Sequence, residues 1–77
     1  MPRVRVKVSA GLTRLLAGRY EATLTLPEGS TVADLLTELG ACPGEIGLVV
    51  RNGYKADQTA VLDDGDEMEL YPLIGGG

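Results

Sequence analysis

The sequence predicts an α+β domain in two layers, with a sheet covered on one face by one main helix. Two segments, Arg3–Val8 and Glu21–Leu26, alternate between polar and apolar residues, which is the period of a half-buried strand. A third segment, Thr31–Leu39, places its apolar residues three and four positions apart, which is the period of an amphipathic helix. A helix with a single apolar stripe buries that stripe against one face of a sheet. One layer of helix on one layer of sheet is the α+β two-layer class.

The first two strands are each expected to present one apolar face to the core. In Arg3–Val8 the outward residues are all basic, and in Glu21–Leu26 they are a glutamate and two threonines. Pro27 and Gly29 end the second strand. The inward residues of the two strands are Val4, Val6, Val8, Ala22, Leu24 and Leu26.

Two helical segments are predicted. A short helical turn lies within Leu12–Gly18, in a long connection between the first two strands, and its glycine is a natural stop. The main helix begins at Thr31, which forms an approximate capping box with Asp34, and it ends at Gly40. The apolar residues of these segments are Leu12, Leu15, Leu16, Val32, Leu35, Leu36 and Leu39.

The segment Ile46–Asp57 predicts an apolar strand followed by a tight turn and a short return strand. The dipeptide Asn52-Gly53 is a strong signal for a two-residue hairpin turn. A second turn is expected at Asp63–Asp66, because aspartate and glycine favour turn conformations.

The last strand is predicted at Glu67–Tyr71. Alternation places Met68 and Leu70 toward the core, and the ring of Tyr71 is expected to join them. Because proline donates no ladder hydrogen bond, strand pairing is expected to stop at Pro72.

The composition excludes several classes of function. The 77 residues allow one domain with a small aliphatic core, and no apolar run reaches the roughly 20 residues of a membrane span. A net charge of −4 disfavours nucleic-acid binding and favours a partner with a basic face. Histidine is absent, which removes histidine-dependent catalysis and metal sites, so we expect no stand-alone active site and no bound metal. The single cysteine and the lack of a signal-peptide pattern suit a cytoplasmic protein.

Two features invite a chemical interpretation, but a structural interpretation is favoured for both. Cys42 follows a helix C-terminus, where the dipole opposes a thiolate, so we interpret it as a small, half-buried thiol in a loop. The carboxylates between Asp63 and Glu69 suit a hard cation, but they lack the loop spacing of a calcium site. We interpret them as a solvated turn and the outward face of a strand. The glycine run at the end precedes no helix, so it predicts no phosphate-binding loop.

The order of these elements and three motifs resemble the ubiquitin-like sulfur-carrier family, and within it the small subunit of molybdopterin synthase. Pro27–Leu36 reads PEGSTVADLL, which fits the family pattern P-E-G-x-T-V-x-D-L-L position for position. Asp64–Met68 reads DGDEM and fits D-G-D-E-V with one conservative change. Tyr71–Gly77 reads YPLIGGG and fits the family ending aromatic-Pro-Pro-Val-small-Gly-Gly without a gap, although Leu73 replaces the second proline. The resemblance covers essentially the whole chain.

The resemblance implies a fold and a chemistry. The fold is a ubiquitin-like β-grasp domain at residues 1–72, with a mixed sheet of four to five strands, followed by a flexible tail at residues 73–77 that ends in Gly-Gly. In the implied chemistry, a partner that resembles ubiquitin-activating enzymes adenylates the Gly77 carboxylate with ATP, and a sulfurtransferase with a persulfide converts it into a thiocarboxylate. The sulfur then passes to a pterin precursor on the large subunit of molybdopterin synthase, or to an equivalent acceptor, in molybdenum or tungsten cofactor biosynthesis. The chain itself is expected to bind no cofactor.

The tail residues suit this chemistry physically. A terminal carboxylate with a pKa of about 3.5 is ionised at neutral pH and is a poor electrophile, so activation by ATP is needed. Glycines lack side chains and can thread a narrow channel, and five residues can extend about 16 Å. Two apolar residues beside them offer a surface that a partner can bury. The residues expected to enter the partner are Pro72, Leu73, Ile74, Gly75 and Gly76, and Gly77 is the reactive end.

Three alternatives remain open at the level of sequence. Carriers of the thiamine pathway or of tRNA thiolation share the implied fold, although the long connection Ser9–Gly18 favours the pterin branch. A ubiquitin-like protein modifier, conjugated to lysines through Gly77, uses the same chemistry up to the adenylate. An interaction domain with an inert tail is the third alternative.

Overall fold

Five strands form one mixed sheet in the order β2-β1-β5-β3-β4. The computed structural model describes residues 1–42 and 44–73 of the chain. The strands are β1 (Arg3–Val8), β2 (Glu21–Thr25), β3 (Ile46–Arg51), β4 (Tyr54–Lys55) and β5 (Glu67–Pro72). β1 and β5 pair in parallel and the other neighbours pair antiparallel, so the predicted mixed sheet is confirmed.

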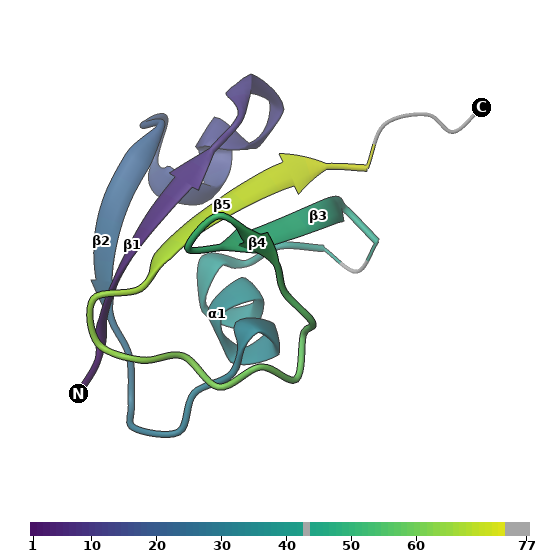
Figure 1. Ribbon diagram of the computed structural model, residues 1–77. Coiled ribbons are helices and arrows are strands. Elements are labelled where there is room, and N and C mark those ends of the chain that lie inside the picture. The colour runs from purple at the N-terminus through teal and green to yellow at the C-terminus, as the bar shows by residue number, and fades with distance from the viewer. Residues whose placement is uncertain (43, 74–77) are drawn as a thin grey trace.

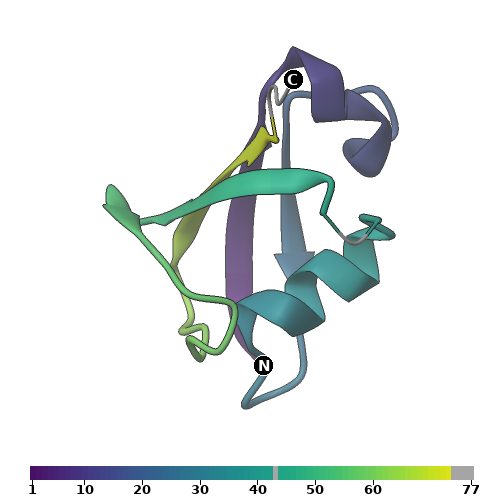
Figure 2. The ribbon, with the colours of Figure 1, turned by 90° about the vertical axis from the view of Figure 1, so that its right-hand side faces the viewer.

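One sheet face is covered by the helix α1 (Val32–Leu39) and by the 3₁₀ helix η1 (Ala10–Leu16). Figure 1 shows α1 crossing behind the sheet, and Figure 2 shows both helices on the same side of it. The predicted α+β two-layer class is therefore confirmed, with α1 as the main helix. Within residues 1–42 and 44–73, no helix has the length and apolar character needed to cross a membrane.

The core forms where the apolar faces of the strands meet the two helices. The inward valines of β1 and the predicted leucines of η1 are all buried, as the periodicity indicated. Ala22 and Leu24 are only half-buried, because β2 is an edge strand. The buried apolar side chains are Val4, Val6, Val8, Leu12, Leu15, Leu16, Leu26, Val32, Leu35, Leu36, Val49, Leu62, Met68 and Leu70.

The ends of α1 follow the predicted signals. The Thr31 side chain accepts a hydrogen bond from the Asp34 N–H at 3.2 Å, and the Asp34 carboxylate accepts one from the Thr31 N–H at 2.9 Å. This capping box satisfies backbone donors that the first helical turn leaves free. Gly40 closes the helix with a φ of 78°, a conformation in which glycine carries no steric penalty.

The turn before β5 contains a buried carboxylate that the sequence interpretation placed in solvent. Asp66 is 6% exposed. Its carboxylate accepts hydrogen bonds from Arg51 Nε at 2.8 Å, from Asn52 Nδ2 at 3.0 Å and from the Asp63 N–H at 2.8 Å. Asp66 therefore joins the β3–β4 turn to the start of β5, and the interpretation of this residue as a solvated turn residue was wrong.

This network predicts an acid-sensitive contribution to stability. Burial alone raises the pKa of Asp66, but the hydrogen bonds from Asp63, Asn52 and Arg51 outweigh it and hold the pKa below its ordinary value. A depressed folded pKa gives stability that is present above the unfolded value of about 3.9 and is lost as the pH falls through the folded pKa. We expect Asp66→Asn to lower the free energy of unfolding by about 1–3 kcal/mol at pH 7.

Urea unfolding between pH 2 and pH 7 measures this effect. The wild type and Asp66→Asn should converge at low pH, where the carboxyl group is protonated in both the folded and the unfolded wild type. Asp57→Asn, at an exposed aspartate outside this network, is the control. A pH-independent difference between Asp66→Asn and the wild type would contradict the prediction.

Candidate functional site at the end of the last strand

The predicted site residues lie where β5 leaves the sheet. Pro72 and Leu73 are within the described residues, whereas Ile74–Gly77 lie outside them. β5 is the central strand, between β1 and β3, and its C-terminal end lies beside the connection from α1 to β3 (Figure 1). We refer to Pro72 and Leu73 as the tail base.

Strand pairing continues past the residue where it was expected to stop. Pro72 is the last residue of β5 and lies opposite Ile46, and the Leu73 N–H donates a hydrogen bond to the Glu45 carbonyl at 2.9 Å. Pro72 is tolerated because its nitrogen faces the other neighbour, β1. The Leu70 carbonyl accepts from Ser9 N–H on that side, and the β1 ladder ends at the pair Val8 and Leu70. No ladder hydrogen bond is lost, so the prediction that pairing ends at Pro72 was wrong.

Gly47 faces the tail base at an unusually short separation. A Cβ atom on Gly47 would lie 2.7 Å from Leu73 Cα and 3.0 Å from the Pro72 carbonyl oxygen. The pairing shifts register between Ile46 and Leu48, at this residue. Gly47 lies in none of the motifs that predicted the site. A glycine inside an apolar strand was the available signal, because such glycines often mark a bulge or a close backbone approach.

The sheet face opposite the helices, here called the open face, carries an apolar pair next to the tail base. Leu48 and Tyr71 are cross-strand partners and are 38% and 39% exposed, and Leu73 is 66% exposed. The expectation that the Tyr71 ring joins the core was therefore wrong. The Tyr71 hydroxyl donates to Glu69 Oε2 at 2.9 Å, and this hydrogen bond raises the pKa of the phenol.

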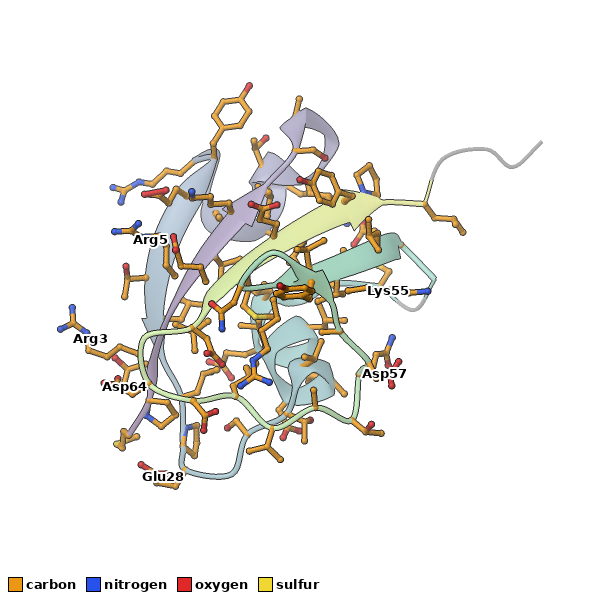
Figure 3. All side chains as sticks on the ribbon, viewed as in Figure 1. Arg3, Arg5, Glu28, Lys55, Asp57 and Asp64 are labelled. Carbon is orange, nitrogen blue, oxygen red and sulfur yellow. The ribbon has the colours of Figure 1, made fainter. Side chains whose placement is uncertain are left out.

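Farther from the tail base, the open face carries ion pairs that join β1 to β5 and β2. The outward basic residues of β1, which the alternation predicted, lie next to the acidic residues of β5 and β2. Arg5 contacts Glu67 at 3.2 Å and Glu21 at 3.9 Å, and Lys7 lies 3.9 Å from Glu67. Figure 3 shows Arg3, Arg5 and Asp64 at the β1 side of the molecule, away from the end of β5. A shallow depression of about 400 Å³ lies there, lined by Arg3, Arg5, Thr23 and the turn Asp64–Glu67.

The two other features considered for chemistry show no built site. Cys42 is exposed rather than half-buried, since it lies in the open connection between α1 and β3. Its backbone N–H donates to Glu45 Oε1 at 3.0 Å. Within residues 1–42 and 44–73, no three carboxylate or thiol side chains are grouped as a metal ion would require.

Comparison with protein families gives one match over most of the chain. The model of the ThiS family matches residues 6–77. A search of the curated proteins found no match.

Solved structures share the fold over nearly the whole chain. Small archaeal modifier protein 1 of Haloferax volcanii is 27% identical, with a TM-score of 0.78, and the match covers 96% of this chain and 100% of that one. A protein of Pyrococcus furiosus, assigned as molybdopterin converting factor, subunit 1, is 26% identical with a TM-score of 0.78 and the same coverage. A complex of subunits 1 and 2 of the molybdopterin-converting factor of Helicobacter pylori matches at 18% identity and a TM-score of 0.63, over 97% of this chain and 99% of that one, which shows the fold alone. The ubiquitin-like β-grasp fold is therefore confirmed.

Proposed function

Because the chain belongs to the ThiS family, we propose that it is a sulfur carrier that bears sulfur as a thiocarboxylate on the carboxyl group of Gly77. The observation that supports the proposal most is the span of the family match, residues 6–77, which includes the terminal glycines. β5, the central strand of the sheet, ends at Pro72, and in the sequence Leu73 and Ile74 separate it from those glycines.

The proposed chemistry takes place on partners. An adenylating enzyme joins the Gly77 carboxylate to AMP and releases pyrophosphate, which supplies a leaving group that an ionised carboxylate lacks. A persulfide on a sulfurtransferase attacks the carbonyl carbon and displaces AMP. A second thiol then cleaves the sulfur–sulfur bond, which leaves the thiocarboxylate on Gly77 and a disulfide on the donor. ATP is thus consumed by the partner, and this chain is its co-substrate.

We propose a pterin precursor as the acceptor, held by the large subunit of a molybdopterin synthase. The assignment of the 26%-identical Pyrococcus furiosus protein as molybdopterin converting factor, subunit 1, supports this choice. The alternatives within the same chemistry are acceptors of the thiamine pathway and of tRNA thiolation. We place the reaction in the cytoplasm, where a single unpaired thiol such as Cys42 is compatible with the reducing environment.

A second candidate function is protein modification through Gly77. The 27%-identical Haloferax volcanii protein is a small archaeal modifier protein, and its similarity to this chain equals that of the Pyrococcus furiosus protein in TM-score. A modifier and a carrier share the adenylate and differ in the nucleophile that follows, a lysine amine or a persulfide. Gly-Gly remnants on the lysines of other proteins, found by mass spectrometry of cell extracts, would favour the modifier.

Intact-mass measurement tests the carrier directly. Incubation with ATP, an adenylating enzyme and a persulfide donor is expected to raise the mass by about 16 Da, because one oxygen of the activated carboxyl group is replaced by sulfur. Reactions without ATP or without the donor are the controls, and neither should give the 16 Da increase. An unchanged mass, with an enzyme that demonstrably forms the Gly77 adenylate, would contradict the proposal.

A further inference from the structure

The tail base is attached to the segment that precedes and begins β3. The Leu73 N–H donates to the Glu45 carbonyl at 2.9 Å, and Pro72 lies opposite Ile46. These contacts fall after the last pair between β5 and β1, so β3 holds the final residues of β5 from one side. The direction in which the chain leaves the sheet therefore depends on Glu45 and on the residues that follow it.

Gly47 permits this attachment because it has no side chain. The three atoms nearest to a Cβ built there are Leu73 Cα at 2.7 Å, Leu73 N at 3.0 Å and the Pro72 carbonyl oxygen at 3.0 Å. All three belong to the backbone, so they cannot swing aside as a flexible side chain would. Gly47 does not have a positive φ, unlike the turn glycines, so close approach is the reason for glycine at this position.

Glu45 is fixed by contacts on both sides of its carboxylate. Oε1 accepts the Cys42 N–H at 3.0 Å, and the carboxylate forms an ion pair with Arg14 of η1. The Glu45 side chain is 21% exposed, so the ion pair is partly shielded from solvent. Glu45, whose carbonyl accepts the Leu73 N–H, is thus connected through Arg14 to η1 and through Cys42 to the end of α1.

The opposite side of the tail base is bounded by η1. The position of a Cβ atom on Gly11 lies 3.9 Å from the Pro72 ring, which is ordinary contact. Figure 2 shows η1 and the end of β5 at the same edge of the molecule. Pro72 therefore lies between β3 and η1.

We propose that Glu45 and Gly47 are positioning residues that fix the exit direction of the C-terminal segment. Gly77 then reaches the active site of the adenylating partner with few alternative directions of the segment to exclude. This inference rests on the proposed function. The physical reason is preorganisation: a tail that leaves the domain in one direction loses less conformational freedom on entering a channel. It also delivers the carboxylate to ATP in a reactive geometry, where displacements of about 1 Å can lower a rate by about 100-fold.

Gly47→Ala tests the proposal, with Gly11→Ala as the matched control. Both variants add one methyl group beside the tail base, but only the one at position 47 meets backbone atoms at 2.7 Å. The two readouts are hydrogen exchange of the Leu73 amide and steady-state adenylation with the carrier as varied substrate. We expect Gly47→Ala to remove the protection of Leu73 and to lower kcat about 10- to 100-fold, with KM changed less than about threefold. Gly11→Ala should leave all three quantities near those of the wild type.

Additional measurements keep the outcome decisive if Gly47→Ala does not fold. The Leu73 amide of the wild type should exchange more slowly than an unstructured amide. Glu45→Gln, which preserves side-chain size but removes the ion pair with Arg14, should accelerate that exchange severalfold. Leu73 exchange at the unstructured rate in the wild type would overturn the proposal, as would equal kcat values for folded Gly47→Ala and Gly11→Ala. The proposed function fails separately, when the wild type itself is neither adenylated nor converted to the thiocarboxylate.

Discussion

Deletion of Gly76 and Gly77 is expected to abolish sulfur transfer while the domain stays folded and still binds its partner. The new terminal carboxylate, on Gly75, would end about 7 Å short, since each extended residue spans about 3.3–3.6 Å. Reacting atoms must approach to about 3–3.5 Å, so a carboxylate this far from ATP is not activated. Gly76 and Gly77 have no side chains that could pack in the core, so thermal unfolding should be unchanged. Intact mass after incubation with the adenylating enzyme, ATP and the persulfide donor measures the transfer, and calorimetric titration with the large subunit measures binding.

An extended variant is the complement of this deletion. One alanine added after Gly77 moves the carboxylate outward by about 3.5 Å and places a methyl group where glycine was expected to thread. It too should fail to gain 16 Da unless a protease removes the alanine. Normal sulfur transfer by the deletion variant would contradict the carrier proposal and support an interaction domain with an inert tail. Loss of partner binding along with transfer would show that the tail also carries most of the affinity.

Much of the fold could be predicted because its local signals agree with its tertiary structure. The alternation in Arg3–Val8 fixes which side chains of β1 face the core, and the capping box of Thr31 and Asp34 fixes where α1 begins. Asn52-Gly53 fixes a tight hairpin turn. Each of these signals lies within a few residues of the feature that it determines, so a single sequence contains it.

Three of the differences concern contacts between segments that are distant along the chain. Asp66 is buried because Arg51 and Asn52 arrive beside it through the β3–β5 pairing, which no local pattern encodes. The pairing beyond Pro72 depends on which neighbour faces its nitrogen, and that depends on where the β1 ladder ends. The role of Gly47 depends on the register shift in β3. The roles of the tail residues Ile74–Gly77 were predicted from a resemblance. They stay a prediction, which the experiments above test.

Leu48→Asp is expected to weaken partner binding about 30-fold or more. Leu48 and Tyr71 form an exposed apolar pair beside Leu73, and each is exposed by more than a third although both lie within strands. Apolar and aromatic residues at the centre of an interface contribute most of its affinity, and an unpaired carboxylate buried there costs about 2 kcal/mol or more. Calorimetric titration with the adenylating enzyme, and separately with the large synthase subunit, measures the change in Kd.

Thr23→Asp supplies the matched control, since it adds the same charge to the open face on β2, at the opposite edge of the sheet. If the apolar pair is the contact surface, Thr23→Asp should bind within about threefold of the wild type. Leu48→Asp and Gly47→Ala should then change different kinetic constants of adenylation. Leu48→Asp should raise KM with kcat nearly unchanged, because it removes binding that substrate and transition state share, whereas Gly47→Ala should lower kcat. Equal losses from Thr23→Asp and Leu48→Asp would instead indicate that the partner responds to overall charge, and they would contradict a contact between the partner and the apolar pair.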